Sequence, residues 1–231
     1  RVEGPSLREL VAETDPALAE EIAAKLDATM GALTALAEAA EGGLAYDTML
    51  EAGNAEGEAL IMAALFASQG YIVVAPDYAG YDSSTLPYHP YLVADQQSKD
   101  MIDALAAARS ALPAAAAPAT TDGGRLFITG YSQGGYVAMA THRAMQSAGM
   151  TVTASAPMSG PYAMAAFVDA VFSGRVSSGA TVSFTLLMTA YQKAYGNVYS
   201  GTAEVFEAQY ASGIESLLPS TTSRGVLYAQ G

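Results

Sequence analysis

The hydrophobic residues in the first part of the chain recur at helical spacing. Between residues 17 and 40 the apolar positions are Leu18, Ile22, Leu26, Met30, Leu33 and Leu36. The acidic and basic residues between them can face water, which is the pattern of an amphipathic helix. Gly42 and Gly43 end this pattern. We expect residues 1–43 to form an acidic, alanine-rich helical arm that packs against other surfaces and carries no chemistry.

From residue 44 to 160, short apolar runs alternate with helical patterns. The runs cover 71–75, 125–129 and 151–156, and the helical patterns cover about 55–69, 93–111 and 133–148. A continuous apolar run rich in β-branched residues is typical of a strand buried on both faces of a parallel sheet. Strands and helices in alternation are joined by right-handed crossovers. The pattern therefore predicts an α/β fold with a parallel sheet.

After Pro157 the pattern is helical throughout. Helices are predicted at about 161–173, 180–195 and 202–212, in a part of the chain that is rich in tyrosine, phenylalanine and methionine. An aromatic helical block that follows a sheet favours a cap, and we expect residues 161–231 to form one. The alternative is ordinary helical core. Under a cap, the side chains expected to line an apolar pocket include some of Met164, Phe167, Phe172, Phe184 and Met188.

Composition and charge exclude several classes of function. A net charge of −13 repels nucleic acid. The absence of cysteine excludes disulfides and thiolate ligands, and two histidines offer no ligand cluster, so we expect neither a metal nor a cofactor. No apolar run approaches the roughly 20 residues that a membrane-spanning helix needs. The chain starts at Arg1 without a signal peptide, so we expect it to be processed or to be part of a longer polypeptide.

The segment Gly130-Tyr131-Ser132-Gln133-Gly134 carries the candidate chemistry. It lies between a predicted strand and a predicted helix, where a sharp turn exposes the serine hydroxyl as a nucleophile. The backbone N–H of Gln133 then points at the developing oxyanion, supported by the amino end of the helix. We expect Gly130 and Gly134 to be glycines because a side chain there would collide with the strand or the helix, and we expect Gly135 to relieve the next contact. The alternative is a glycine-rich turn with an incidental serine.

Four segments together, 67–78, 89–92, 130–135 and 155–162, resemble one protein superfamily. They are similar to secreted bacterial esterases and lipases of the α/β-hydrolase superfamily, in the group near secretory lipases and lipase A-type enzymes. The resemblance implies a parallel-sheet hydrolase core, incomplete in this chain, with a helical cap after the sixth strand. It also implies carboxylic-ester hydrolysis by a secreted or periplasmic protein. The expected domains are then the arm at 1–43, the core segment at 44–160 and the cap at 161–231.

The catalytic triad of this fold has the order serine, acid, histidine, and the sequence departs from it. Only His142 follows Ser132, ten residues along the helix. At about 1.5 Å per residue it lies roughly 15 Å away, whereas a general base must lie within about 3 Å. His89 precedes the serine and is interpreted as part of the turn that starts the next helix. We predict that the catalytic acid and histidine lie outside residues 1–231, for example on a companion polypeptide.

The His-Gly pair that usually supplies the second oxyanion donor in this family is absent from the sequence. The candidates are Asp77-Tyr78, after the predicted strand at 71–75, and Tyr46-Asp47. Either pair could aim a donor at the serine.

The sequence thus predicts a serine hydrolase of carboxylic esters that acts through an acyl-enzyme on Ser132. Tyr131, Met164 and Phe167 are expected to contact the substrate, a small-molecule or lipid ester. Two alternatives stay open. The first is a non-catalytic or degenerate binding module with a hydrolase fold, and the weaker second is a serine peptidase.

Overall fold

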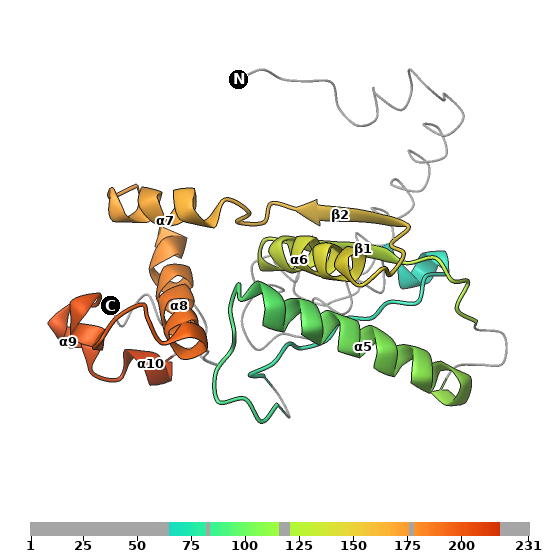
Figure 1. Ribbon diagram of the computed structural model, residues 1–231, viewed down its shortest axis with the longest axis horizontal. Helices are drawn as coiled ribbons and strands as arrows, with labels where there is room; N and C mark the ends of the chain where they lie inside the picture. The colour runs from blue at the N-terminus through green and yellow to red at the C-terminus, as the bar shows by residue number, and fades with distance from the viewer. Residues whose placement is uncertain (1–64, 82–83, 116–120, 176–177, 218–231) are drawn as a thin grey trace, which may run out of the picture. The chain divides into compact units, whose positions relative to one another are not determined.

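The computed structural model describes residues 65–81, 84–115, 121–175 and 178–217 (Figure 1). Contacts divide the chain into two units, Arg1–Val73 with Thr222–Gly231, and Val74–Thr221. The predicted arm at 1–43, most of the predicted helix at 55–69 and the pair Tyr46-Asp47 lie outside the described residues. The proposed domain boundaries therefore stay predictions.

Two parallel strands with a helix between them form the centre of the second unit. Strand β1 (Phe127–Tyr131) pairs with β2 (Ala154–Met158), with Thr129 opposite Ala156. Helix α6 (Gln133–Ser147) connects the two strands and packs on both. Helix α5 (Ala94–Ala115) packs against α6, as Figure 1 shows. This strand–helix–strand unit confirms the predicted α/β fold with a parallel sheet, and both strands lie two or three residues later than predicted.

The hydrophobic core lies between α6, α5 and one face of this sheet. Ile128, Ala138 and Met145 are buried there, and their partly buried neighbours are Ile102, Leu105, Leu126, Met150 and Val152. Alternate residues of a strand point to opposite faces. The other face bears Phe127, Tyr131 and Met158, which are 45%, 63% and 47% exposed. Burial of the strands on both faces was therefore predicted wrongly for the part of the chain that the structure describes.

Residues 71–75 do not form the predicted strand. They lack strand geometry, and Tyr71, Ile72 and Val73 are 49%, 42% and 38% exposed. A strand forms only when a neighbouring strand takes up its backbone N–H and C=O groups. Among the described residues the sheet consists of β1 and β2. Residues 71–75 are apolar, but no other strand within the described residues pairs with them. The preceding 3₁₀ helix η1 (Ala67–Gln69) ends at Gly70, whose φ of 87° is left-handed.

After β2, the predicted helices at about 161–173 and 180–195 are confirmed, whereas the predicted helix at 202–212 is broken into short elements. Helix α7 (Met164–Phe172) and helix α8 (Ser178–Tyr195) are followed by three short elements, η2 (Thr202–Glu204), α9 (Ala208–Ala211) and α10 (Ile214–Leu217). Phe172 of α7 and Phe184 of α8 meet edge to face with ring centroids 5.5 Å apart.

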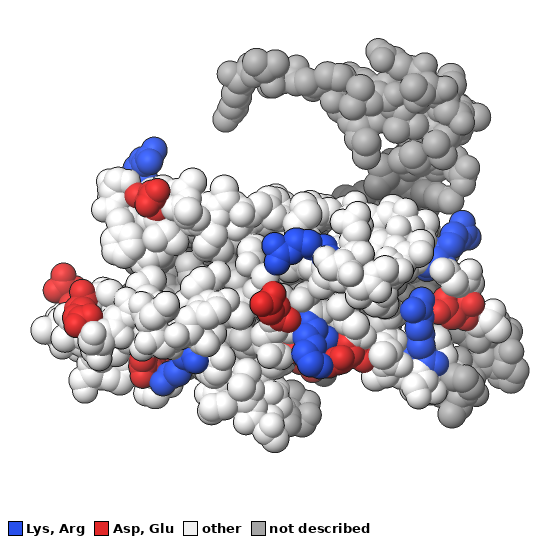
Figure 2. All heavy atoms as spheres, in the orientation of Figure 1, with Lys and Arg blue, Asp and Glu red and all other residues white. Residues whose placement is uncertain are grey.

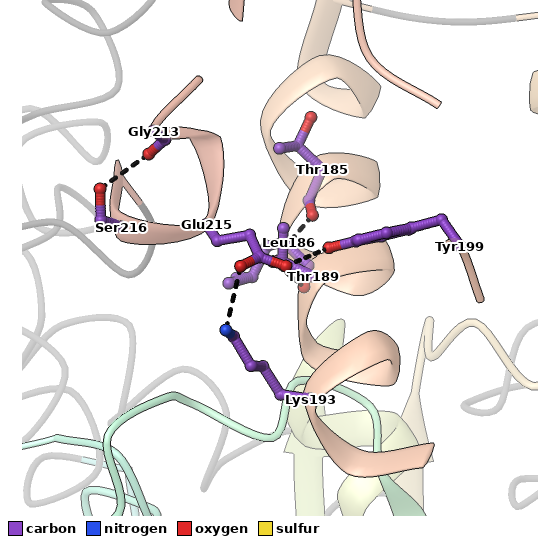
Figure 3. A network of polar contacts seen from close by, with 8 residues as sticks. All are labelled: Thr185, Leu186, Thr189, Lys193, Tyr199, Gly213, Glu215 and Ser216. Atoms are coloured by element: carbon purple, nitrogen blue, oxygen red, sulfur yellow. Dashed lines mark hydrogen bonds and ion pairs between the residues drawn. The ribbon is translucent and has the colours of Figure 1, made fainter. Parts of the chain in front are cut away.

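A polar network fixes α10 on α8 (Figure 3). Glu215 Oε1 accepts a hydrogen bond from the Tyr199 hydroxyl at 2.7 Å, and Glu215 Oε2 pairs with Lys193 at 3.0 Å. The hydrogen bond from Tyr199 and the ion pair with Lys193 lower the pKa of Glu215. Burial and the same hydrogen bond raise the pKa of Tyr199. Both carboxylate oxygens of Glu215 therefore have structural partners, Tyr199 and Lys193.

Charged side chains are sparse on the described part of the chain. Figure 2 shows them in small separate groups with uncharged surface between them. More than half of the acidic residues precede residue 65. Within the described ranges, no helix is long and apolar enough to cross a membrane, and no three metal-ligating side chains gather.

Candidate active site

Ser132 occupies the sharp turn between β1 and α6. Its φ of 55° and ψ of −116° are rare for a residue with a side chain, and it is exposed. Such strain costs on the order of 1–3 kcal/mol and persists only where the surroundings enforce it. Here Ser132 N donates to Met158 O of β2 at 3.0 Å, and Ser132 O accepts from Tyr136 N at 3.2 Å. The turn therefore presents the hydroxyl outward at the carboxyl end of β1.

Gln133 is the first residue of α6, so its backbone N–H has no acceptor within the helix. Such an N–H, at the positive end of the helix dipole, suits an anion. The role of Gln133 N–H as the oxyanion donor stays a prediction.

The turn requires glycine at some, but not all, of the positions where the sequence predicts that requirement. A Cβ on Gly130 would lie 2.2 Å from Gly134 O, and one on Gly135 would lie 2.2 Å from Met158 O. A Cβ on Gly134 would meet nothing within 4 Å. The prediction that a side chain at Gly134 collides with the strand is therefore wrong. It is the backbone of Gly134 that crowds Gly130, and Gly135 makes the close contact with β2.

We expect Gly135→Ala to destabilise the protein and Gly134→Ala to be tolerated. The first change forces a backbone shift at β2, at a cost of about 1–3 kcal/mol. The second places alanine in the first turn of a helix, where it is favoured over glycine by roughly 0.5–1 kcal/mol. Thermal unfolding of both variants measures the difference. Equal melting temperatures would contradict the packing of α6 on β2 described above.

His89 is the most buried histidine near this turn, at 1% exposure. Its Nε2 lies 2.7 Å from the side-chain amide nitrogen of Gln133, and its Nδ1 lies 3.0 Å from Ala79 O. Burial lowers the pKa of His89, against the opposing effects of the Ala79 hydrogen bond and of Asp100. Both ring nitrogens are engaged, so His89 is not placed to take the proton of Ser132.

His142 is also engaged away from the serine. A hydrogen bond of 2.8 Å joins its Nδ1 to the hydroxyl of Ser155, near the start of β2. It ties α6 to the sheet, as expected for a packing residue.

The acids after Ser132 form no catalytic pair with either histidine. Glu215 is held by Tyr199 and Lys193, and Glu204 accepts a hydrogen bond from Ser200 N at 2.9 Å. Asp169 and Glu207 are exposed. No hydrogen bond or ion pair joins these acids to a histidine within the described residues.

The loop that carries Asp77 and Tyr78 lies against His89. Tyr78 has a φ of 66°, and its ring stacks on the imidazole with centroids 5.9 Å apart. Ala79 N donates to Asp100 of α5 at 2.9 Å. Asp77 is exposed. This loop and Gln133 thus both contact the imidazole of His89. No contact between the loop and Ser132 is seen within the described residues.

An apolar groove of about 360 Å³ lies in the helical segment. It is lined by Met164, Val168, Phe172, Leu187, Met188, Tyr191, Val198 and Val205. Three of the five side chains predicted for an acyl pocket are among them. Phe167 and Tyr131 are 43% and 63% exposed and do not line it, and neither does Ser132.

Comparison with known proteins agrees with this geometry. The sequence profile of the prolyl oligopeptidase family matches residues 60–203, well over half of the chain. The solved structure of the rice cell wall degrading esterase LipA from Xanthomonas oryzae is 34% identical, with a TM-score of 0.67, over 78% of this chain. The chain belongs to the prolyl oligopeptidase family of α/β-hydrolases.

Two further matches concern the fold and the first residues of the chain. A putative hydrolase from Legionella pneumophila shares the fold with a TM-score of 0.67 at 24% identity, over 77% of this chain and 47% of that chain. The profile of the imelysin family matches residues 1–70, which include the predicted arm. No curated protein matches the chain.

The chain spans about half the length of the esterase it resembles, 50% of that chain. The fold and the relationship to bacterial esterases are therefore shown for a partial core. The activity of a whole enzyme is a matter for proposal.

Sequence reasoning missed the contact that one residue of the chain makes with the elbow. His89 is interpreted from the sequence as part of the turn that starts the next helix, and that interpretation does not predict its contact with Gln133. A signal was present, because His89-Pro90-Tyr91-Leu92 is one of the four segments that carry the family resemblance. In the structure His89, Pro90 and Leu92 are buried.

Proposed function

We propose that this hydrolase cleaves carboxylic esters through an acyl-enzyme on Ser132. The observation that carries the proposal is the strained, exposed Ser132 at the amino end of α6. The 34% identity to a cell wall degrading esterase supports an ester as the substrate.

The reaction begins when Ser132 Oγ attacks the ester carbonyl carbon while its proton passes to a general base. The carbonyl oxygen becomes an oxyanion that accepts a hydrogen bond from Gln133 N–H, and a second donor comes from Asp77-Tyr78 or Tyr46-Asp47. Collapse of the intermediate expels the alcohol, which takes up the proton. Water then attacks the acyl-enzyme by the same route and releases the acid.

The general base and its acid belong, in this proposal, to polypeptide outside residues 1–231. The chain has two histidines, and both have hydrogen bonds elsewhere. A companion polypeptide would then complete the site. We further propose a secreted or periplasmic location, because the similar Xanthomonas protein is described as degrading a cell wall.

Covalent labelling with a fluorophosphonate tests the assignment of the nucleophile. With imidazole supplied as an external base, we expect mass spectrometry to place one phosphonyl group on Ser132 of the folded chain. Absence of any label under these conditions, with the fold intact by circular dichroism, would favour the non-catalytic binding module instead.

A serine peptidase is the second candidate, and the name of the matching family is the observation that favours it. The same elbow can attack an amide carbonyl. Comparing an activated ester with a prolyl anilide separates the two: faster acylation of Ser132 by the anilide would overturn the ester proposal.

We propose that residues 161–231 form a cap and that the groove in the helical segment holds the acyl chain. Its lining is almost entirely aliphatic and aromatic, which suits an alkyl group. Met188, at 9% exposure, is part of that lining.

Filling the groove should reduce the preference for long acyl chains. We expect Met188→Trp to slow phosphonylation of Ser132 by an octyl fluorophosphonate by about tenfold relative to the ethyl reagent, as losing one or two methylene contacts would. Met139→Trp, on the exposed side of α6, is the matched control. An unchanged octyl-to-ethyl ratio in Met188→Trp would remove the groove from the proposal.

A further inference from the structure

His89 joins two segments, one of which begins next to Ser132. One is the loop of residues 77–81, and the other is the start of α6. Its imidazole is 1% exposed and lies among the rings of Tyr78, Tyr81 and Tyr91, with the Tyr81 centroid 4.5 Å away. A buried imidazole that contacts a residue next to the nucleophile, but is not the base, needs another role.

The hydrogen bonds of His89 fix one tautomer. Ala79 O can only accept, so Nδ1 carries the proton and donates to it. The amide nitrogen of Gln133 can only donate, so Nε2 is the acceptor. One neutral imidazole satisfies both partners at once, and the pKa lowered by burial keeps it neutral near pH 7.

The loop of residues 77–81 packs closely around the side of the His89 imidazole that faces away from Gln133. Gly80 has a φ of 91°, and a Cβ there would lie 2.2 Å from Tyr88 O. Ala79 N is held by Asp100, and Ala79 O by His89. The position of His89 therefore depends on this loop, and the position of the Gln133 side chain depends on His89.

We propose that His89 is a positioning residue, which holds Gln133 against the loop of residues 77–81 so that the Gln133 N–H stays aimed at the oxyanion. The inference rests on the proposed function, because it assigns an oxyanion to that N–H. Misplacing a catalytic group by about 1 Å can cost 10²-fold in rate. Loss of the His89 contact should therefore slow acylation of Ser132 without removing the nucleophile.

Two substitutions separate the two hydrogen bonds. His89→Asn places an amide near the position of Nδ1 and keeps the contact with Ala79, but it leaves Gln133 without an acceptor. His89→Gln places an amide near the position of Nε2 and keeps the contact with Gln133. His142→Asn is the matched control, since it alters the other histidine, whose partner is Ser155.

The measurement is the rate at which a fluorophosphonate labels Ser132 with imidazole supplied as the external base, together with the melting temperature of each variant. We expect His89→Asn to slow labelling about tenfold to 10²-fold, His89→Gln to recover most of that loss, and His142→Asn to match the wild type. Gln133→Met, which removes the amide but keeps its length, should slow labelling as His89→Asn does. The double variant with His89→Asn and Gln133→Met should be labelled at the same rate as Gln133→Met alone, because both substitutions remove the same contact.

A second readout concerns the contact itself. In ¹⁵N-labelled protein we expect a protonated Nδ1 and an unprotonated Nε2 at His89. The side-chain amide signal of Gln133 should move in His89→Asn and stay close to its wild-type position in His89→Gln.

The outcomes distinguish this inference from the proposed function. Labelling of the wild type with no effect of His89→Asn would overturn the positioning role alone. Equal slowing in His89→Asn and His89→Gln, in step with lower melting temperatures, would show that His89 serves only stability and would also overturn it. A wild type that is never labelled, even with imidazole supplied as the base, would refute the proposed function and with it the catalytic meaning of the His89–Gln133 contact.

Discussion

The Ser132→Ala variant is expected to fold as the wild type does and, once the missing acid and histidine are supplied, to lose at least about 10³-fold of the ester hydrolysis. The elbow provides one nucleophile, and the hydroxyl forms no cap for α6 whose loss would destabilise the helix. Alanine adopts a φ of 55° with about the same strain as serine, so the melting temperature should hardly change. Steady-state hydrolysis of an activated ester and thermal unfolding check the two parts.

A glycine at the same position is the informative companion variant. Ser132→Gly should be as inactive as Ser132→Ala but more stable, by about 1 kcal/mol, because glycine relieves the strain of the turn. Activity that persists in a folded Ser132→Ala protein would show that the nucleophile lies elsewhere. A Ser132→Gly protein less stable than Ser132→Ala would contradict the strained turn.

The elbow could be predicted from sequence because its causes are local. A β-branched strand, glycines at 130 and 135, and an amphipathic helix lie within some twenty residues, and the structure has β1, the turn and α6 in that order. The helices after Pro157 were predicted for the same reason, since helical periodicity is a property of one segment.

The failures concern contacts between segments. Residues 71–75 have the composition of a buried strand, yet composition cannot supply the neighbouring strand. Gly134 and Gly135 look equivalent in the sequence, and only the approach of Met158 from β2 separates them. The contact between His89 and Gln133 spans 44 positions, and no local pattern reports it.

The candidate site was predicted only in part for a related reason. Ser132 and Gln133 come from one turn, so a short motif identifies them. Asp77-Tyr78 lies on a loop whose approach to the elbow depends on His89 and Asp100. The roles of Tyr131, Met164 and Phe167 depend on where a substrate lies, and those assignments stay predictions.

The chain of residues 1–231 alone is expected to be a very slow catalyst. Without a base near Ser132 the hydroxyl stays protonated at neutral pH, and the elbow would contribute only the residual 10³–10⁴-fold over water that survives loss of a triad. Both histidines are occupied, His89 by Ala79 and Gln133 and His142 by Ser155. His142→Ala should leave this slow rate unchanged.

Supplying the missing base should raise that rate, and imidazole in solution is the simplest source. Imidazole titrates near neutrality, so it can take the proton of Ser132 if the site is open, as the exposure of Ser132 indicates. We expect the rate to rise with imidazole concentration in the wild type and not in Ser132→Ala, which corrects for direct attack of imidazole on the ester. A polypeptide that carries the acid and histidine in place should raise it by orders of magnitude more.

Turnover on the order of 10 per second by the purified chain, free of companion peptide and insensitive to imidazole, would refute the split site. Loss of that turnover in His89→Ala would then identify His89 as the base.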